Sequence, residues 1–213
     1  MTQRCVNVNR IMNSLCIFGK NSVICQKLLP KIQNYDAFDR QQFDVRNFRA
    51  IESFDFSGYD TVINFAGHSR GSYKSPIENS YQNYVDQIEV NFTSNILIAK
   101  KFCSVNPQGR YIWISSSLVK SCRPYQAVYG ASKSATELVF EKWQQEYQQF
   151  KFITLRIGRC KTNHMYNTFE HTRSFDTVDD EYNLTPYLTA DQVAEKLFYL
   201  LDIKQSITEE MLP

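Results

Sequence analysis

Short apolar runs recur along the chain, separated by stretches with helical periodicity, and this alternation constrains the fold more than any other feature. The runs begin near residues 15, 35, 61, 111 and 152. A continuous apolar run is typical of a strand that is buried on both faces, as in a parallel sheet. Successive parallel strands need crossover connections, which are usually helical. The sequence therefore predicts an α/β fold: a doubly wound parallel sheet with helices on both faces.

The most informative stretch runs from residue 111 to residue 150. An apolar strand opens into three serines, and Tyr129-Gly-Ala-Ser-Lys133 follows near the start of a helix predicted over residues 128–149. Tyr129 and Lys133 are four positions apart, so on a helix their side chains leave the same face. An ammonium beside a phenol favours the phenolate and lowers a pKa that starts at about 10. Ser116 ends the strand, where its hydroxyl can donate a hydrogen bond to a bound carbonyl.

This strand, its serines and the Tyr-x-x-x-Lys segment resemble the catalytic segment of the short-chain dehydrogenase/reductase family. Tyr-x-x-x-Lys alone is common, and a tyrosine beside a snorkelling lysine is its plain structural interpretation. The serine strand upstream makes the pattern specific. The resemblance implies a Rossmann-type fold and an NAD(P)-dependent oxidoreductase that interconverts a small-molecule carbonyl and an alcohol. It assigns Tyr129 to proton exchange, Lys133 to the nicotinamide ribose and Ser116 to orienting the carbonyl.

Asn91 completes the catalytic set that the resemblance implies. It lies in residues 76–103, a stretch whose apolar residues recur with helical period. In the family, a helix asparagine at this place holds a water that links the lysine to solvent. A buried amide without a partner costs about 1–3 kcal/mol, so Asn91 needs one. That partner is either the relay water or another group inside the protein.

The loop after the first strand resembles the family's glycine-rich phosphate loop but keeps one glycine, Gly19. Depending on the alignment, Ser22 or Val23 stands at the second glycine position, and Cys25 at the third. Each adds a Cβ where the family lets the backbone approach the pyrophosphate. We therefore expect loose phosphate contact, with the next helix at residues 26–32. The residues assigned to this part of the cofactor site are Gly19, Lys20, Ser22, Val23 and Ile24.

Residues after the later strands complete the predicted cofactor site. Asp39 and Arg40 follow the strand predicted at residues 35–38. A carboxylate there accepts the ribose hydroxyls of NAD, whereas an arginine pairs with the 2′-phosphate of NADP. The sequence allows either NAD or NADP as the cofactor, and Arg40 with Lys20 slightly favours NADP. By resemblance, the remaining cofactor-binding residues are Asp44, Val45, Asn64, Phe65, Ala66, Gly67, Tyr129, Lys133 and Thr162.

Composition argues against several other classes of protein. The net charge is +2 and the Lys and Arg residues are not clustered, so no nucleic-acid partner is expected. No apolar stretch approaches the roughly 20 residues of a membrane span. The six cysteines are scattered without a C-x-x-C pair, which fits reduced thiols in the cytoplasm better than disulfides or a metal site.

The same interpretation divides the chain. Residues 1–13 show no pattern and are expected to be a poorly ordered extension, and residues 14–213 to form one domain. The polar stretch 159–187 is typical of a substrate loop. The chain stops where the family's final strand begins, so that strand is expected to be missing or minimal. Surplus apolar residues on the helix at 128–149 predict that it packs, with the helix near 82–104, in a homodimer or homotetramer.

A protein that keeps this fold without turnover is the alternative: a non-catalytic dinucleotide sensor or a protein-binding relative. The side chains at the later glycine positions support it. Against it stands the complete set of four catalytic residues, which a protein without chemistry has no reason to keep.

Overall fold

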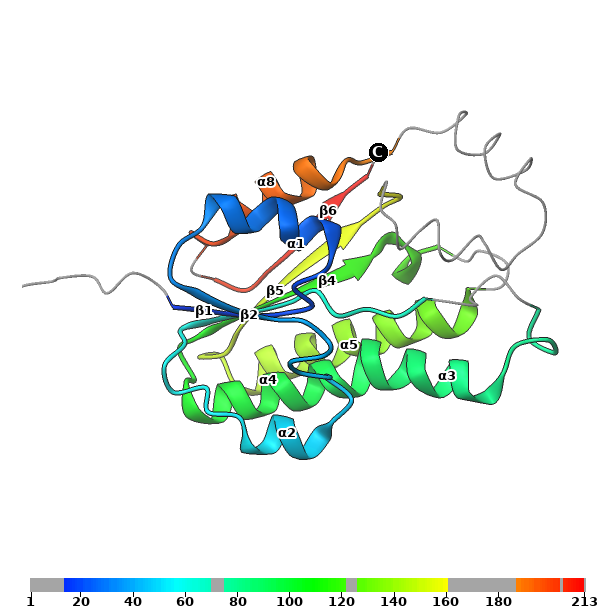
Figure 1. Cartoon of the computed structure of the whole chain (residues 1–213), viewed down its shortest axis with the longest axis horizontal. Helices are drawn as coiled ribbons and strands as arrows, with labels where there is room; N and C mark the ends of the chain where they lie inside the picture. The colour runs from blue at the N-terminus through cyan, green and yellow to red at the C-terminus, as the bar shows by residue number, and fades with distance from the viewer. Residues whose placement is uncertain (1–13, 70–74, 122–125, 161–186, 204, 213) are drawn as a thin grey trace, which may run out of the picture.

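A computed structural model describes residues 14–69, 75–121, 126–160, 187–203 and 205–212. Its strands form one parallel sheet in the order β2-β1-β3-β4-β5-β6, which confirms the predicted α/β fold (Figure 1). The strands are β1 (Leu15–Phe18), β2 (Tyr35–Phe38), β3 (Thr61–Asn64), β4 (Arg110–Ser116), β5 (Lys151–Ile157) and β6 (Ile207–Met211).

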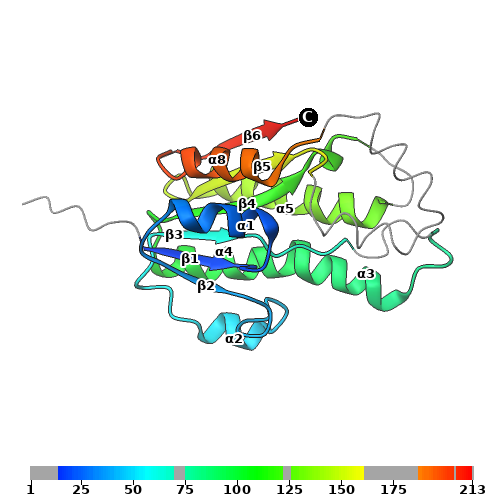
Figure 2. The ribbon, with the colours of Figure 1, turned by 45° about the horizontal axis from the view of Figure 1, so that its top comes forward.

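Helices cover both faces of this sheet, as Figures 1 and 2 show. The α-helices are α1 (Val23–Leu28), α2 (Phe48–Ser53), α3 (Tyr81–Ile88), α4 (Ser94–Val105), α5 (Ala127–Glu146) and α8 (Ala190–Leu200). Because side chains alternate along a strand, neighbouring residues of β1 belong to different cores. Ile17 packs in the core beneath α1 and α8, and Phe18 in the core beneath α2, α4 and α5.

Three helices differ from their predicted bounds. Helix α5 ends at Glu146, three residues before its predicted end. Helix α1 begins at Val23, three residues before the predicted start, because Ser22 has the extended backbone of an N-cap. The helix predicted over residues 76–103 is interrupted: a π-helical turn (Glu89–Thr93) separates α3 from α4. Such turns occur often at functional sites, and Asn91 lies at the centre of this one.

The expectation that the final strand is missing or minimal is wrong. Strand β6 pairs in parallel with β5 from Ile153↔Ile207 to Ile157↔Met211. Ile207 and Met211 pack against the core of the α1 and α8 face. The intervening acidic residues hid this strand in the sequence. Helix α8 begins as predicted, with a capping box between Thr189 and Gln192.

Several predictions fall on residues outside the described ranges. They are the poor order of residues 1–13, Thr162, and most of the predicted substrate loop at 159–187. Among the helices that are described, none is both long enough and apolar enough to cross a membrane.

Candidate functional site

A cavity of about 540 Å³ lies at the carboxyl ends of the central strands. Gly19 follows β1, Phe65 follows β3, Ser117 follows β4 and Gly158 follows β5, and all of them line it. The chain order reverses between β1 and β3, which is where doubly wound sheets bind their ligands.

Most of the predicted site residues meet in this cavity. The predicted residues that line it are Gly19, Ser22, Val23, Ile24, Asp39, Arg40, Asp44, Val45, Phe65, Ala66, Gly67, Ser116, Tyr129 and Lys133. Three others are not among its lining residues: Lys20, Asn64 and Asn91. Asn64 instead braces the sheet, where its Oδ1 accepts the Ala66 N–H at 2.9 Å.

Lys133 is held rigidly beneath Tyr129 on helix α5. Its side chain is buried, with 4% of the residue exposed, and its Nζ donates to the Ile114 carbonyl of β4 at 2.8 Å. The same Nζ lies 5.0 Å from the centre of the Trp113 ring and 5.9 Å from that of Tyr129. Burial lowers the pKa of Lys133 to about 8, and the Glu137 carboxylate opposes that shift. The lysine therefore stays largely protonated at neutral pH, so a cation stands beside the phenol.

Ser116 ends β4 with its hydroxyl oriented by the backbone. Its Oγ accepts the Leu118 N–H at 3.2 Å and caps a 3₁₀ turn (Ser117–Val119). Because the oxygen accepts there, the hydroxyl hydrogen can point to a ligand oxygen in the cavity.

Asn91 is fully buried, and its side-chain amide and main-chain oxygen both have protein partners. Its side chain accepts the His68 N–H at 2.9 Å and donates to the His68 carbonyl at 2.8 Å and the Ser132 hydroxyl at 3.2 Å. Its main-chain oxygen accepts from Asn95 Nδ2 and Thr136 Oγ1, both at 2.9 Å. These hydrogen bonds hold the turn after β3 in place. They also give the buried Asn91 amide its partners inside the protein. The relay role stays a prediction.

The phosphate loop differs in detail from the expectation. Gly19 has φ +82°, and a Cβ there would lie 2.8 Å from the Ala66 nitrogen. Ser22 and Val23 do reach the cavity. The prediction that Cys25 also obstructs the phosphate is not supported, since this thiol is fully buried with Leu28 in the core beneath α1.

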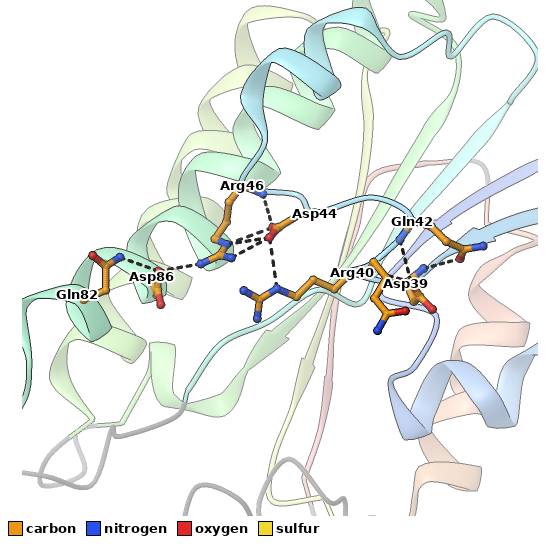
Figure 3. A network of polar contacts seen from close by, with 8 residues as sticks. Asp39, Arg40, Gln42, Asp44, Arg46, Gln82 and Asp86 are labelled. Atoms are coloured by element: carbon orange, nitrogen blue, oxygen red, sulfur yellow. Dashed lines mark hydrogen bonds and ion pairs between the residues drawn. The ribbon is translucent and has the colours of Figure 1, made fainter.

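A network of charged side chains lines the cavity at the end where the chain leaves β2 (Figure 3). Arg46 pairs with Asp44 at 2.8 Å and with Asp86 of α3 at 3.0 Å. The Arg46 hydrogen bond lowers the pKa of Asp44 to about 2, so this carboxylate stays ionised. Arg40 also contacts Asp44, at 3.3 Å, with 70% of its side chain exposed.

Some lining residues are not among the predicted site residues. Asp86 comes from α3, far from Arg46 in sequence, and no local pattern joins them. A lone loop histidine is more often a bystander, yet His68 lines the cavity and its Nε2 lies 3.1 Å from Asn83 Oδ1. Gln126 lines the cavity one turn before Tyr129, and its buried Oε1 has no partner among the described residues.

Comparison with known proteins agrees with this architecture. Residues 15–173 match the family model for short chain dehydrogenases. Similar structures include a serine dehydrogenase, in its closed form complexed with NADP+ (17% identity, 94% of this chain and 95% of the other, TM-score 0.79). Another is an alcohol dehydrogenase from Thermococcus sibiricus complexed with 5-hydroxy-NADP (20% identity, 94% and 95%, TM-score 0.70). At these identities the likeness is one of fold. No curated protein sequence matches.

Proposed function

The chain belongs to the short-chain dehydrogenase family, and on this premise we propose that it interconverts a carbonyl and an alcohol by hydride transfer with NAD(P)(H). One observation carries the proposal: a single cavity joins Tyr129, Lys133 and Ser116 to the loops after β1 and β2. A proton donor, a cation and a carbonyl-orienting hydroxyl therefore open into the space that also reaches Gly19 and Arg40.

The residues of the cavity fit a dinucleotide that extends from Arg40 to Tyr129. When bound, the nicotinamide ring supplies or accepts the hydride. Tyr129 gives its phenolic proton to the oxygen that forms on reduction, or takes it on oxidation. The Lys133 ammonium, 5.9 Å from the tyrosine ring, stabilises the phenolate that remains. Ser116 donates its hydroxyl hydrogen to the substrate oxygen and holds the carbonyl in place.

We infer a preference for NADP(H) from the state of the side chains after β2. The Asp39 carboxylate already accepts the Gln41 and Gln42 N–H groups, at 2.9 and 3.0 Å, which ties it to its own turn. Arg46 is held between two carboxylates, whereas Arg40 is exposed and can turn to a 2′-phosphate. Arg40→Ala should weaken NADPH binding about tenfold or more and change NADH binding little. Equal losses for both cofactors would contradict the preference.

Replacement of the proton donor tests the reaction. Tyr129→Phe removes only the hydroxyl, so it should lower kcat at least about 100-fold while NADPH affinity changes by a few-fold or less. The measurements are NADPH oxidation with a panel of aldehydes and ketones, and fluorescence titration with NADPH. Tyr147→Phe, near the far end of α5 and exposed, is the matched control. Wild-type rates in Tyr129→Phe would refute the mechanism.

A dinucleotide sensor without turnover is the second candidate, favoured by the Ser22 and Val23 side chains in the cavity. Wild-type protein that binds NADPH but turns over no member of the panel, in either direction, would favour it.

A further inference from the structure

One partly buried carboxylate behind the cavity joins three elements of the fold. Glu137 of α5 accepts the Ser115 hydroxyl of β4 at 2.5 Å. It also accepts Arg156 of β5, from Nε at 2.9 and 3.0 Å and from Nη2 at 2.5 Å. Ser115 and Arg156 are paired in register on adjacent strands, so their side chains leave the same face of the sheet. Glu137 thus closes a helix and two strands into one hydrogen-bonded unit.

Stability alone does not account for this unit. The Glu137 and Arg156 side chains are 13% and 21% exposed, so both charges lose most of their hydration. An ion pair at such depth gives little or no net stability compared with a well-packed apolar pair. An apolar pair would also fill the space between α5 and the sheet. The pair therefore calls for an explanation in the neighbouring site.

Ser115 connects Glu137 to the catalytic residues through the backbone. The residue before it, Ile114, has the carbonyl that accepts Lys133 Nζ at 2.8 Å. The residue after it is Ser116, whose hydroxyl reaches the cavity. Lys133 and Glu137 are one helical turn apart on α5, on the same face. A carboxylate that holds Ser115 therefore fixes the peptide that anchors the lysine and presents the serine.

We propose that Glu137 is a positioning residue for the Tyr129, Lys133 and Ser116 site, fixing the end of β4 against α5 and placing a negative charge one helical turn from Lys133. The effect on catalysis rests on the proposed oxidoreductase function. The arrangement of charges around Lys133 is independent of that function and can be tested without it.

The charges around Lys133 set the direction of its response. Along α5 it is flanked by the Tyr129 phenol and the Glu137 carboxylate; β4 presents the neutral Trp113 ring and the Ile114 carbonyl. From β5, Arg156 faces Glu137 and screens it. Burial lowers the pKa of Lys133, and Glu137 raises it. Removing the carboxylate should therefore lower the lysine pKa, and removing Arg156 should raise it.

Titration of Lys133 by NMR tests this without any substrate. Protein is labelled with [ε-¹³C]lysine, and the Lys133 signal is assigned with Lys133→Arg. The wild-type pKa is expected at about 8, with a lower value in Glu137→Gln and a higher value in Arg156→Gln. Opposite shifts are the signature of a charge effect, because a structural disturbance alone would move both variants in the same direction. Glu195→Gln removes a pair with Lys31 on the surface of α8, and it should leave the signal unchanged.

Breaking this ion pair is destabilising, so a thermal unfolding curve first establishes that each variant is folded at the temperature of the titration. If Glu137→Gln does not fold, Glu137→Asp keeps the charge but withdraws it by one methylene, and the Lys133 pKa should again fall. An unchanged pKa in the variant that folds, or shifts of the same sign in the Glu137 and Arg156 variants, overturns the proposal. In an active enzyme, Glu137→Gln should also move the alkaline limb of kcat to lower pH. Because the NMR titration needs no turnover, its failure is separate from a failure of the Tyr129→Phe test.

Discussion

The two ends of the cavity differ in what their functions require of the side chains that line them. At the α5 and β4 end, the site depends on side chains that are present: Lys133 is held by the Ile114 carbonyl, and Ser116 is oriented by the Leu118 N–H. At the β1 and α1 end, the family relies on side chains that are absent, and here Ser22 and Val23 intrude. Catalytic chemistry needs particular atoms in the cavity, whereas close approach to a phosphate needs an empty space.

Gly19 shows why one glycine remains at the second end. A Cβ at this position would meet the backbone after β3, at Phe65 and Ala66. The fold itself therefore requires this glycine, whatever happens to the cofactor. Ser22 and Val23 instead line the cavity, where the fold accommodates their side chains.

The largest expected effect on the fold comes from Gly19→Ala. The new Cβ would lie 2.8 Å from the Ala66 nitrogen, at a φ of +82° that non-glycine residues rarely adopt. Backbone strain of this kind costs about 1–3 kcal/mol before the steric clash is counted, and the thermal midpoint should fall by roughly 5–10 °C. Gly58→Ala is the matched control, because a Cβ at that position would have nothing within 4 Å. Equal midpoints for the two variants would show that the loop moves without strain.

A smaller loss of stability is expected from glycine substitutions at Cys25 and Ser22, and the two variants should differ. Cys25→Gly removes a buried side chain from the core and adds a glycine to α1, so it should cost about 2–3 kcal/mol of stability. Ser22→Gly changes an N-cap whose side chain makes no capping bond, which should cost only a few tenths of a kcal/mol. Calorimetry should show that Ser22→Gly binds NADPH a few-fold more tightly. Tighter binding in Cys25→Gly instead would mean that position 25 does face the phosphate.

The smallest effect on the folded chain is expected from Leu138→Glu, which tests the proposed homodimer or homotetramer. Leu138 is exposed on α5 and is therefore free to contact a second copy. Trp143 of the same helix packs against Phe140 and Phe152, so replacing it would also disturb the core. Light scattering of wild-type protein should give a multiple of 25.0 kDa. Leu138→Glu should give a monomer, and Gln145→Glu, an exposed change on the same helix, should not. A wild-type monomer would exclude the association.

The fold was largely predictable because central strands buried on both faces are continuous apolar runs. The same logic failed for β6, an edge strand whose two apolar residues, Ile207 and Met211, are separated by three polar ones, two of them acidic. The site was predictable where spacing on one element fixes it, as for Tyr129 and Lys133. It was not predictable where the start of a helix decides direction. With a helix start predicted at residue 26, Cys25 was assigned to the phosphate loop, whereas it lies in the first turn of α1 and is buried in the core.

Within the described part of the chain, the outer strands β2 and β6 each pair with one neighbouring strand only, and both carry acidic side chains. On β2, Asp36 accepts the Tyr59 hydroxyl at 2.7 Å. On β6, Glu209 and Glu210 pair with Lys196 and Lys120. A strand added at either border would have to accommodate these charges, which discourages edge-to-edge aggregation. Concentrated protein should therefore resist growth into extended β-assemblies, and we expect any contacts between copies to use the helical layers.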